Sequence, residues 1–111
     1  MGSVKIDVNA EERTYTQAYA LSTPDGVKSL LRDRHRIGEA TKSTLHSAIE
    51  SAGLNADQTL AIGCLYGLGA DISALAQKVG VKVAEIERWR DEGCAVIAAW
   101  FHRKGITEVR T

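Results

Sequence analysis

The stretch Asp71–Gly93, DISALAQKVGVKVAEIERWRDEG, carries the clearest helical pattern in the chain. In its first part, apolar or small residues recur at the spacing of one helix face, at Ile72, Leu75, Ala76 and Val79. Gly80 interrupts this pattern, and a second helical pattern runs from Val81 through Ile86 and Trp89. Glycine adopts the left-handed backbone that ends many helices without steric cost. The stretch therefore predicts two helices joined by a short turn, with Asp71 capping the first and Gly93 ending the second.

The residue types also fit two helices that cross at a steep angle. Such helices approach closely at one point, and Ala76 is small enough to allow this. We expect a small core beneath the turn, formed by Leu75, Val79, Val81, Ile86 and Trp89. The pattern resembles the helix-turn-helix, a motif whose second helix is presented to the DNA major groove.

The preceding segment Tyr66–Asp71, YGLGAD, extends this resemblance. A helix ending in tyrosine, then a glycine, a capping residue and a Leu-Ala pair is similar to region 4 of bacterial sigma factors. It is also similar to the homeodomain-like units of phage small terminases and transposases. The resemblance covers roughly residues 55–93 and implies that the preceding helix supports the motif from behind, whereas residues 1–54 carry no such resemblance.

The chain has 111 residues, which is the size of one domain with a modest core. Its apolar fraction of 44% and charged fraction of 25% are ordinary for a globular protein. No apolar run is long enough to span a bilayer, and no signal-peptide pattern is present, so we expect a cytoplasmic protein without a membrane partner. In that setting Cys64 and Cys94 are expected to be reduced, buried thiols.

The N-terminal residues allow two interpretations. Residues 4–8 alternate apolar and polar side chains and predict a short strand. The segment Thr14–Leu21 fits either a second strand or part of a helix that starts near residue 10, and we favour the helix. We therefore expect residues 1–22 to form an N-terminal arm, extended or β in part, and residues 23–111 to form one helical domain.

Three helices are predicted before the motif. Thr23 and Pro24 start the first, which Gly38 is expected to end, with Val27, Leu30 and Leu31 facing inward. The second covers about Glu39–Ala52, and Gly53 ends it in the left-handed conformation. Asn55 and Gln58 form a capping box for the third, whose inward residues are expected to be Leu60, Cys64, Leu65 and Leu68.

After the motif, the segment 94–104, CAVIAAWFHRK, is apolar nearly all round and predicts a separate final helix. A helix without a polar face is buried centrally or against another subunit. We predict a homodimer interface formed by Val96, Ile97, Trp100 and Phe101. The tail from Ile106 to Thr111 is expected to fray.

The resemblance places candidate DNA contacts on the outer face of the second motif helix. These are Lys82, Ala84, Glu85, Arg88 and Asp91. Arg88 is expected to grip guanine, Lys82 a phosphate or guanine, and Glu85 cytosine N4. The most basic segment, residues 28–42, has five basic and two acidic residues, a net charge of +3, and can supply phosphate anchors. We assign this role to Lys28, Arg32 and Arg36.

The charge balance argues against strong DNA binding by the motif alone. The whole chain has 14 basic and 14 acidic residues, and residues 71–92 have four basic and five acidic ones, a net charge of −1. Phosphate contacts supply much of the affinity for DNA. An acidic motif is also what a fold reused for protein contacts would show.

No enzymatic motif is present, and no catalytic residue, cofactor or metal site is predicted. The sequence thus predicts a mostly α, multi-helix helix-turn-helix domain with a short extended or β N-terminal arm. The leading hypothesis is a homodimeric, sequence-specific transcriptional regulator of bacterial or phage type that binds double-stranded DNA. The alternatives are a protein-interaction module that binds another regulator, a sigma factor or RNA polymerase, and a DNA-recognition subunit like the phage small terminase.

Overall fold

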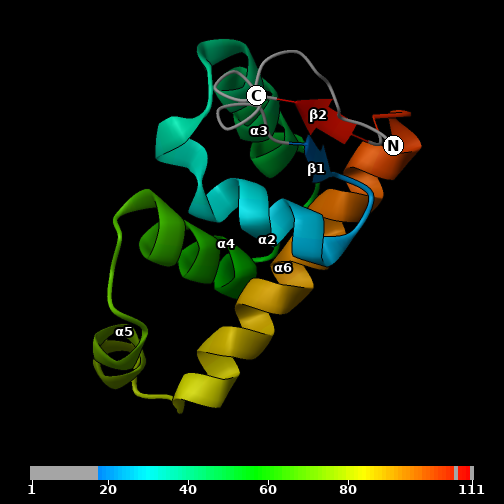
Figure 1. Cartoon of the computed structure of the whole chain (residues 1–111). Coiled ribbons are helices and arrows are strands. Elements are labelled where there is room, and N and C mark those ends of the chain that lie inside the picture. Colours follow the sequence, from blue (N-terminus) through cyan, green and yellow to red (C-terminus); the bar gives the residue numbers. More distant parts are fainter. Residues whose placement is uncertain (1–17, 107, 111) are drawn as a thin grey trace.

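The computed structural model describes residues 18–106 and 108–110, and these residues form a mostly α-helical domain (Figure 1). The predicted strand at residues 4–8 lies outside them. The elements in chain order are strand β1 (Ala18–Ala20), helices α2 (Pro24–Arg32), α3 (Glu39–Ser51), α4 (Ala56–Ile62), α5 (Ile72–Val79) and α6 (Val83–Arg103), and strand β2 (Glu108–Arg110). A 3-10 helix, η1 (Arg34–Arg36), follows α2, and a π-helix, η2 (Gly63–Gly67), continues α4. The predicted fold class is confirmed.

The start of α2 is confirmed, and its predicted end is wrong. Thr23 accepts a hydrogen bond from the backbone N–H of Gly26. Pro24 occupies the first turn, where the backbone N–H that proline lacks would have no partner within the helix. The helix ends at Arg32, and Gly38 instead precedes the first residue of α3 as its N-cap. The basic segment therefore spans three elements, with Lys28 and Arg32 on α2, Arg34 and Arg36 on η1, and Lys42 on α3.

Helix α4 begins as predicted. The side chain of Asn55 accepts from the backbone N–H of Gln58, and the Gln58 side chain accepts from the backbone N–H of Asn55. Its inward face differs from the prediction, because Ala61 and Ile62 are buried while Leu60 and Leu68 are exposed. The wider winding of η2 shifts the apolar register beyond residue 62 and so displaces Leu68 from the predicted face. Leu60 belongs to the regular part of α4, where Ala61 and Ile62 take the inward positions instead.

The connection between α5 and α6 is the one that the sequence predicts. Asp71 caps α5 by accepting from the backbone N–H of Ala74, and Gly80 ends it with a left-handed φ of 87°. Val81 and Lys82 complete the turn, and α6 starts at Val83. Helices α4, α5 and α6 enclose a small cluster of buried side chains formed by Ala61, Leu75, Ala76, Ile86 and Trp89. This arrangement is compatible with a helix-turn-helix.

The predicted helix end at Gly93 is wrong, since α6 continues unbroken for 21 residues to Arg103. Gly93 is buried where α6 crosses α4, and a Cβ atom there would lie 2.5 Å from Cδ1 of Ile62. The glycine therefore serves close helix packing and does not end the helix. One rigid helix of about 31 Å connects the motif to the rest of the domain.

The two strands form a small antiparallel sheet that pairs Tyr19 with Val109. Strand β1 contradicts the helix favoured for this part of the arm, and β2 contradicts the frayed C-terminal tail. Each strand was too short to be recognised without its partner, which lies at the other end of the described chain. Tyr19 and Leu21 are buried in the core, so this end of the arm packs onto the helical domain.

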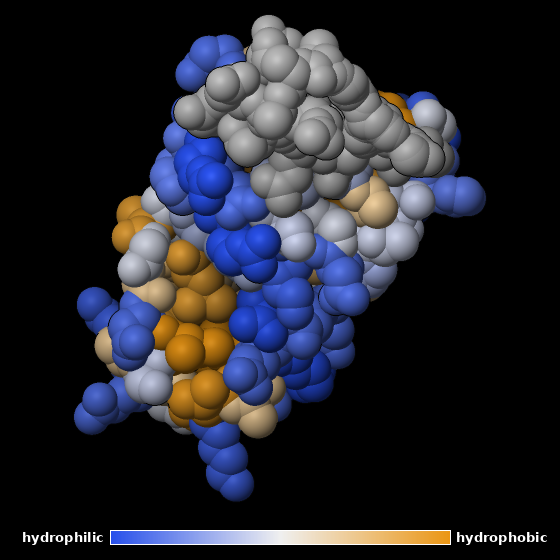
Figure 2. Space-filling model, viewed as in Figure 1, coloured by the Kyte–Doolittle hydropathy of each residue, from blue (hydrophilic) through white to orange (hydrophobic). Residues whose placement is uncertain are grey.

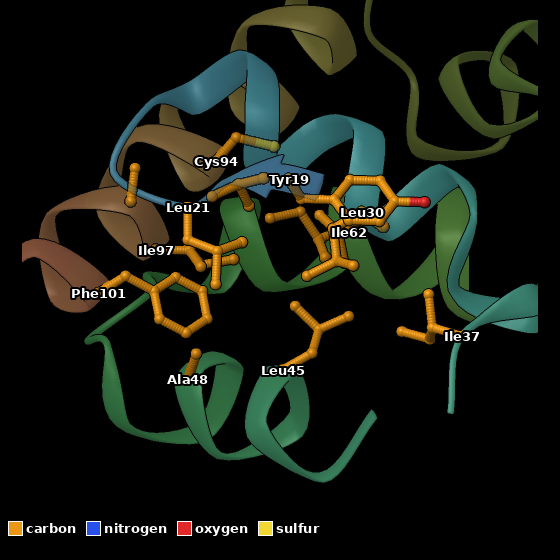
Figure 3. Packing of buried hydrophobic residues seen from close by; sticks show 13 residues of the cluster. Tyr19, Leu21, Leu30, Ile37, Leu45, Ala48, Ile62, Cys94, Ile97 and Phe101 are labelled. Carbon is orange, nitrogen blue, oxygen red and sulfur yellow. The ribbon is translucent and has the colours of Figure 1, made fainter. Parts of the chain in front are cut away.

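A large core fills the space between α2, α3, the sheet and the C-terminal half of α6 (Figure 3). Figure 3 shows Leu21, Leu45, Ala48, Ile97 and Phe101 gathered around the same interior. The hydroxyl of Tyr19 donates to Asp33 at 3.0 Å, which satisfies the buried carboxylate at the end of α2. The molecule thus has two packed regions, the large core and the small cluster, and α6 runs through both.

Candidate nucleic-acid interface

The first half of α6 projects beyond the large core and offers an outer face. Lys82, Ala84, Arg88 and Asp91 are exposed there, and Glu85 is half-buried. Ala84, Arg88 and Asp91 lie on the side of α6 away from Ile86 and Trp89, which face the small cluster. Glu85 stands one turn before Trp89, and Lys82 precedes the helix as its N-cap. The structure therefore brings three of the five predicted contacts onto the outer face of α6, with Glu85 beside it and Lys82 at its N-terminal end.

Arg88 is held between two carboxylates of its own helix. It donates to Glu85 one turn before it and, at 3.0 Å, to Glu92 one turn after it. Hydrogen bonds from Arg88 lower the pKa of Glu85, with a smaller contribution from Trp89. Both acids stand at helical spacings that bring them beside Arg88, Glu85 at i,i+3 and Glu92 at i,i+4, so the same sequence pattern that predicts a DNA contact also permits these ion pairs.

Asp91 connects α6 to the basic segment of α2. Its carboxylate lies 3.4 Å from the Lys28 ammonium and 2.9 Å from the Arg90 guanidinium. The hydrogen bond from Arg90, followed by the charge of Lys28, lowers the pKa of Asp91. The structure thus places Lys28, a predicted phosphate anchor, beside α6, but pairs it with Asp91 of that helix.

The remaining arginines of the basic segment have different surroundings. Arg32 lies 3.4 Å from Asp33, and Arg36 is exposed on η1. Arg34 donates to the backbone carbonyls of Tyr66 and Gly67, at 2.6 and 3.0 Å. These carbonyls lie at the C-terminal end of the π-helix, where backbone acceptors lack helical partners. The positively charged Arg34 guanidinium has several N–H donors and satisfies both of them. Arg34 is therefore a structural link between η1 and η2.

The predicted dimer interface is largely part of the protein's own core. Ile97 and Phe101 have no exposed surface, which removes them from any contact with a second subunit. Trp100 is half-buried, packs edge-on against Phe101 and lies under the Lys104 ammonium. Val96 is also half-buried. The nearly continuous apolar sequence of this helix segment reflects burial within one chain, because α2 and α3 cover it.

An apolar strip borders the small cluster on its outer side. Figure 2 shows it as a hydrophobic band over α4, η2 and α5, with hydrophilic side chains beside it. Leu68 is 81% exposed, and Leu60 and Val79 are about one third exposed, at 37% and 38%. Half-buried Cys64, Leu65 and Ile72 connect these residues to the cluster. A small helical unit with so few buried residues leaves much of its apolar surface uncovered.

Other kinds of site find little support in the part of the chain that the structure describes. Within residues 18–106 and 108–110, no three His, Cys, Asp or Glu side chains are grouped to hold a metal ion. Burial raises the pKa of the Cys94 thiol to about 11, which keeps it protonated at neutral pH. None of the described helices has the length and hydropathy needed to cross a membrane.

Comparison of the chain with protein-family models, curated proteins and solved structures finds no match.

Proposed function

We propose that the protein binds double-stranded DNA as a transcriptional regulator, with the first half of α6 entering the major groove. The observation that carries this proposal is the α5–Gly80–α6 arrangement, which leaves Ala84 and Arg88 on an uncovered helix face, with exposed Lys82 just before the helix. In motifs of this kind, residues at the start of the second helix contact the base edges. The likeness of residues 55–93 to sigma-factor region 4 and homeodomain-like units supports the same reading.

The ion pairs of Arg88 leave it available for a base. Both are exposed, and exposed ion pairs contribute little because water and salt screen them. Arginine makes two parallel hydrogen bonds to guanine O6 and N7, which is the commonest specific contact in the major groove. Arg88 can therefore exchange Glu85 and Glu92 for guanine. Until it does, the two acids hold its guanidinium on the outer face.

The same acids oppose the DNA backbone. Glu85, Glu92 and Asp91 bring negative charge to a surface that must approach phosphates, and Lys28 is paired with one of them. We expect weak nonspecific binding and a larger dependence on correct base contacts. Replacing Glu85 and Glu92 by glutamine should strengthen binding to every duplex, because two repulsive charges disappear.

Selection from a random duplex library at low salt, followed by fluorescence anisotropy, tests the proposal. Arg88→Ala should lower affinity for the selected duplex about tenfold and leave binding to unrelated duplexes nearly unchanged. Lys28→Ala should weaken binding to all duplexes and reduce the salt slope by about one. Arg103→Ala, an exposed change at the far end of α6, is the control. Absence of any preferred duplex, even for the Glu85→Gln/Glu92→Gln protein, would overturn the proposal.

A second candidate function is supported by the apolar strip. Exposed apolar patches with a polar border mark protein-interaction sites. The protein would then bind RNA polymerase or another regulator through Leu60, Leu68 and the acidic first half of α6. Leu68→Glu changes a side chain that is 81% exposed, so it should abolish binding to purified RNA polymerase without unfolding the domain. DNA binding through α6 predicts the opposite pattern: Arg88→Ala should weaken binding to the selected duplex, and Leu68→Glu should leave it unchanged.

A further inference from the structure

A second surface feature lies away from the α5–α6 unit, in a groove between α3 and the α4–η2 segment. Both α3 and α4 pack on other parts of the domain, and they make few direct contacts with each other. The space left between them is about 570 Å³. Pockets that hold small organic ligands have volumes of about 300–1,000 Å³. The groove is therefore of the right size for one small molecule.

The inner wall of the groove is aliphatic. Leu31, Leu45 and Ile62 line it, and each is at least 96% buried, so only a small part of each side chain faces the groove. Ile49 adds a half-buried side chain from α3. These residues belong to the large core or pack on it, so the wall is rigid. An aliphatic wall of this kind favours a flexible or branched hydrocarbon body.

The rim of the groove carries a positive excess. Arg34 and Lys42 line it together with one acid, Glu39, and with His46 and Tyr66. Arg34 is fixed by the carbonyls of Tyr66 and Gly67, and Lys42 makes only an exposed contact with Glu39, at 3.7 Å. An exposed pair at this distance is weak, so the Lys42 ammonium can turn to a ligand. A mobile cation above an aliphatic wall complements an anion on a hydrocarbon body.

One side of the groove is the π-helix η2. Single π-helical turns are rare and occur often at functional sites. Gly63, Tyr66 and Gly67 of η2 line the groove, and Asp71 caps α5 only four residues later. A ligand in the groove would thus contact the segment that leads directly into the α5–α6 unit.

We propose that this groove binds a small amphipathic carboxylate, such as a medium-chain fatty acid, with its chain against Leu31, Leu45, Ile49 and Ile62 and its carboxylate at Lys42. This site does not depend on the function of α6, since binding at the groove is measured without DNA or a protein partner. Alcohols of the same length lack the charge that Lys42 recognises, and amines carry the opposite charge. The order of affinity should be carboxylate, then alcohol, then amine.

Titration of the full chain with decanoate, decanol and decylamine, followed by amide NMR shifts, tests the site. Decanoate should saturate with shifts at residues 42–49 and 59–67, and Lys42→Glu should weaken it about tenfold through loss and reversal of one charge. Lys78→Glu, on exposed α5, is the matched control and should leave the affinity unchanged. Ser43→Trp fills the groove from an exposed position on α3 and should abolish binding while the circular dichroism spectrum stays native.

Three results would each overturn this inference. If decylamine bound as tightly as decanoate, recognition of the carboxylate by Lys42 would be excluded. Amide NMR shifts confined to α5 and the apolar strip would show that the ligand binds at that surface and not in the groove. Absence of saturation for the wild-type protein below the micelle concentration of decanoate would exclude a built site.

Discussion

The two ends of α6 lie in unlike surroundings. Its C-terminal half contributes Ile97 and Phe101 to the large core, where neither side chain has any exposed surface. Its N-terminal half contributes Ile86 and Trp89 to the small cluster, which is edged by half-buried and exposed apolar side chains. One helix therefore passes from a fully covered core to a small cluster with exposed apolar edges.

This difference has a consequence for the stability of the two halves. Local opening requires little free energy where few apolar contacts are buried and more where many are. We expect the α5–α6 unit to open more readily than the large core, although α6 joins them. The predictions that follow alter matched residues at the two ends.

The largest expected effect comes from truncating the two isoleucines of α6 that have no exposed surface. Ile97→Ala should lower the free energy of unfolding by about 4 kcal/mol, near the upper part of the range for buried isoleucine. Ile86→Ala should cost about 2.5 kcal/mol, because the half-buried side chains around the small cluster can move into the space. Urea unfolding measures both values.

Hydrogen exchange sharpens this first prediction. Ile86→Ala should accelerate exchange mainly in α5 and in residues 83–92, whereas Ile97→Ala should accelerate it throughout the domain. Equal acceleration along the whole of α6 in the Ile86→Ala protein would show that the two regions unfold as one unit.

Gly93 lies between the two regions and provides the second prediction. Alanine there would gain about 1 kcal/mol of helix propensity, yet its Cβ would lie 2.5 Å from Ile62 Cδ1 and 3.3 Å from Gln58 Cβ. Overpacking of a core costs about 1–3 kcal/mol, so we expect a net loss of about 1 kcal/mol. Thermal unfolding should show a lower midpoint. Gly63→Ala is the control: a Cβ there meets no atom within 4 Å, and the change should stabilise the protein by about 0.5 kcal/mol.

The contrast between Gly93 and Gly80 also explains how far the sequence could predict the fold. At Gly80, Thr23, Asn55 and Asp71, the residue type acts on its own neighbours, and each predicted turn or cap is confirmed. Gly93 has a role only because Ile62 of another helix lies against it. Its neighbours in sequence carry no sign of that contact, so it was interpreted as a helix end.

The same distinction applies to the candidate site. The outer face of α6 follows from helical periodicity, and Ala84, Arg88 and Asp91 share it in the structure. The interface assigned to Ile97 and Phe101 failed because an all-apolar helix can be covered by its own chain or by another, and periodicity does not distinguish these. The link between Lys28 and Asp91 joins residues 63 positions apart, which no local pattern reveals.

The third prediction concerns the buried pair at the large-core end. Tyr19→Phe removes the donor to Asp33, which is 8% exposed, and should cost about 1–2 kcal/mol at neutral pH. Desolvation opposes ionisation of Asp33, but hydrogen bonds from Tyr19 and Arg32 outweigh it and lower its pKa below 3.8. Burial, followed by the bond to Asp33, raises the pKa of Tyr19 above 10.0.

These shifts fix the pH range of the effect. A lowered carboxyl pKa stabilises the fold above the unfolded value and loses that contribution as pH falls. A raised tyrosine pKa stabilises it below the unfolded value and loses that contribution as pH rises. The difference between wild-type and Tyr19→Phe in urea unfolding should be constant near neutral pH and shrink below about 3.8 and above about 10. A difference that stays constant at both extremes would contradict the assigned hydrogen bond.

The two helix caps, one in each region, provide the last prediction. Thr23→Ala and Asp71→Ala each remove a side chain that accepts from a backbone N–H three residues later, and such changes cost about 1 kcal/mol. The loss at Thr23 should appear in full in global unfolding, because α2 packs on the large core and cannot open alone. The loss at Asp71 should appear mainly as faster hydrogen exchange in α5, with a much smaller change in the global midpoint. Identical shifts of the two midpoints would mean that the small cluster opens only with the whole domain, and the α5–α6 unit would then be as rigid as the core that supports it.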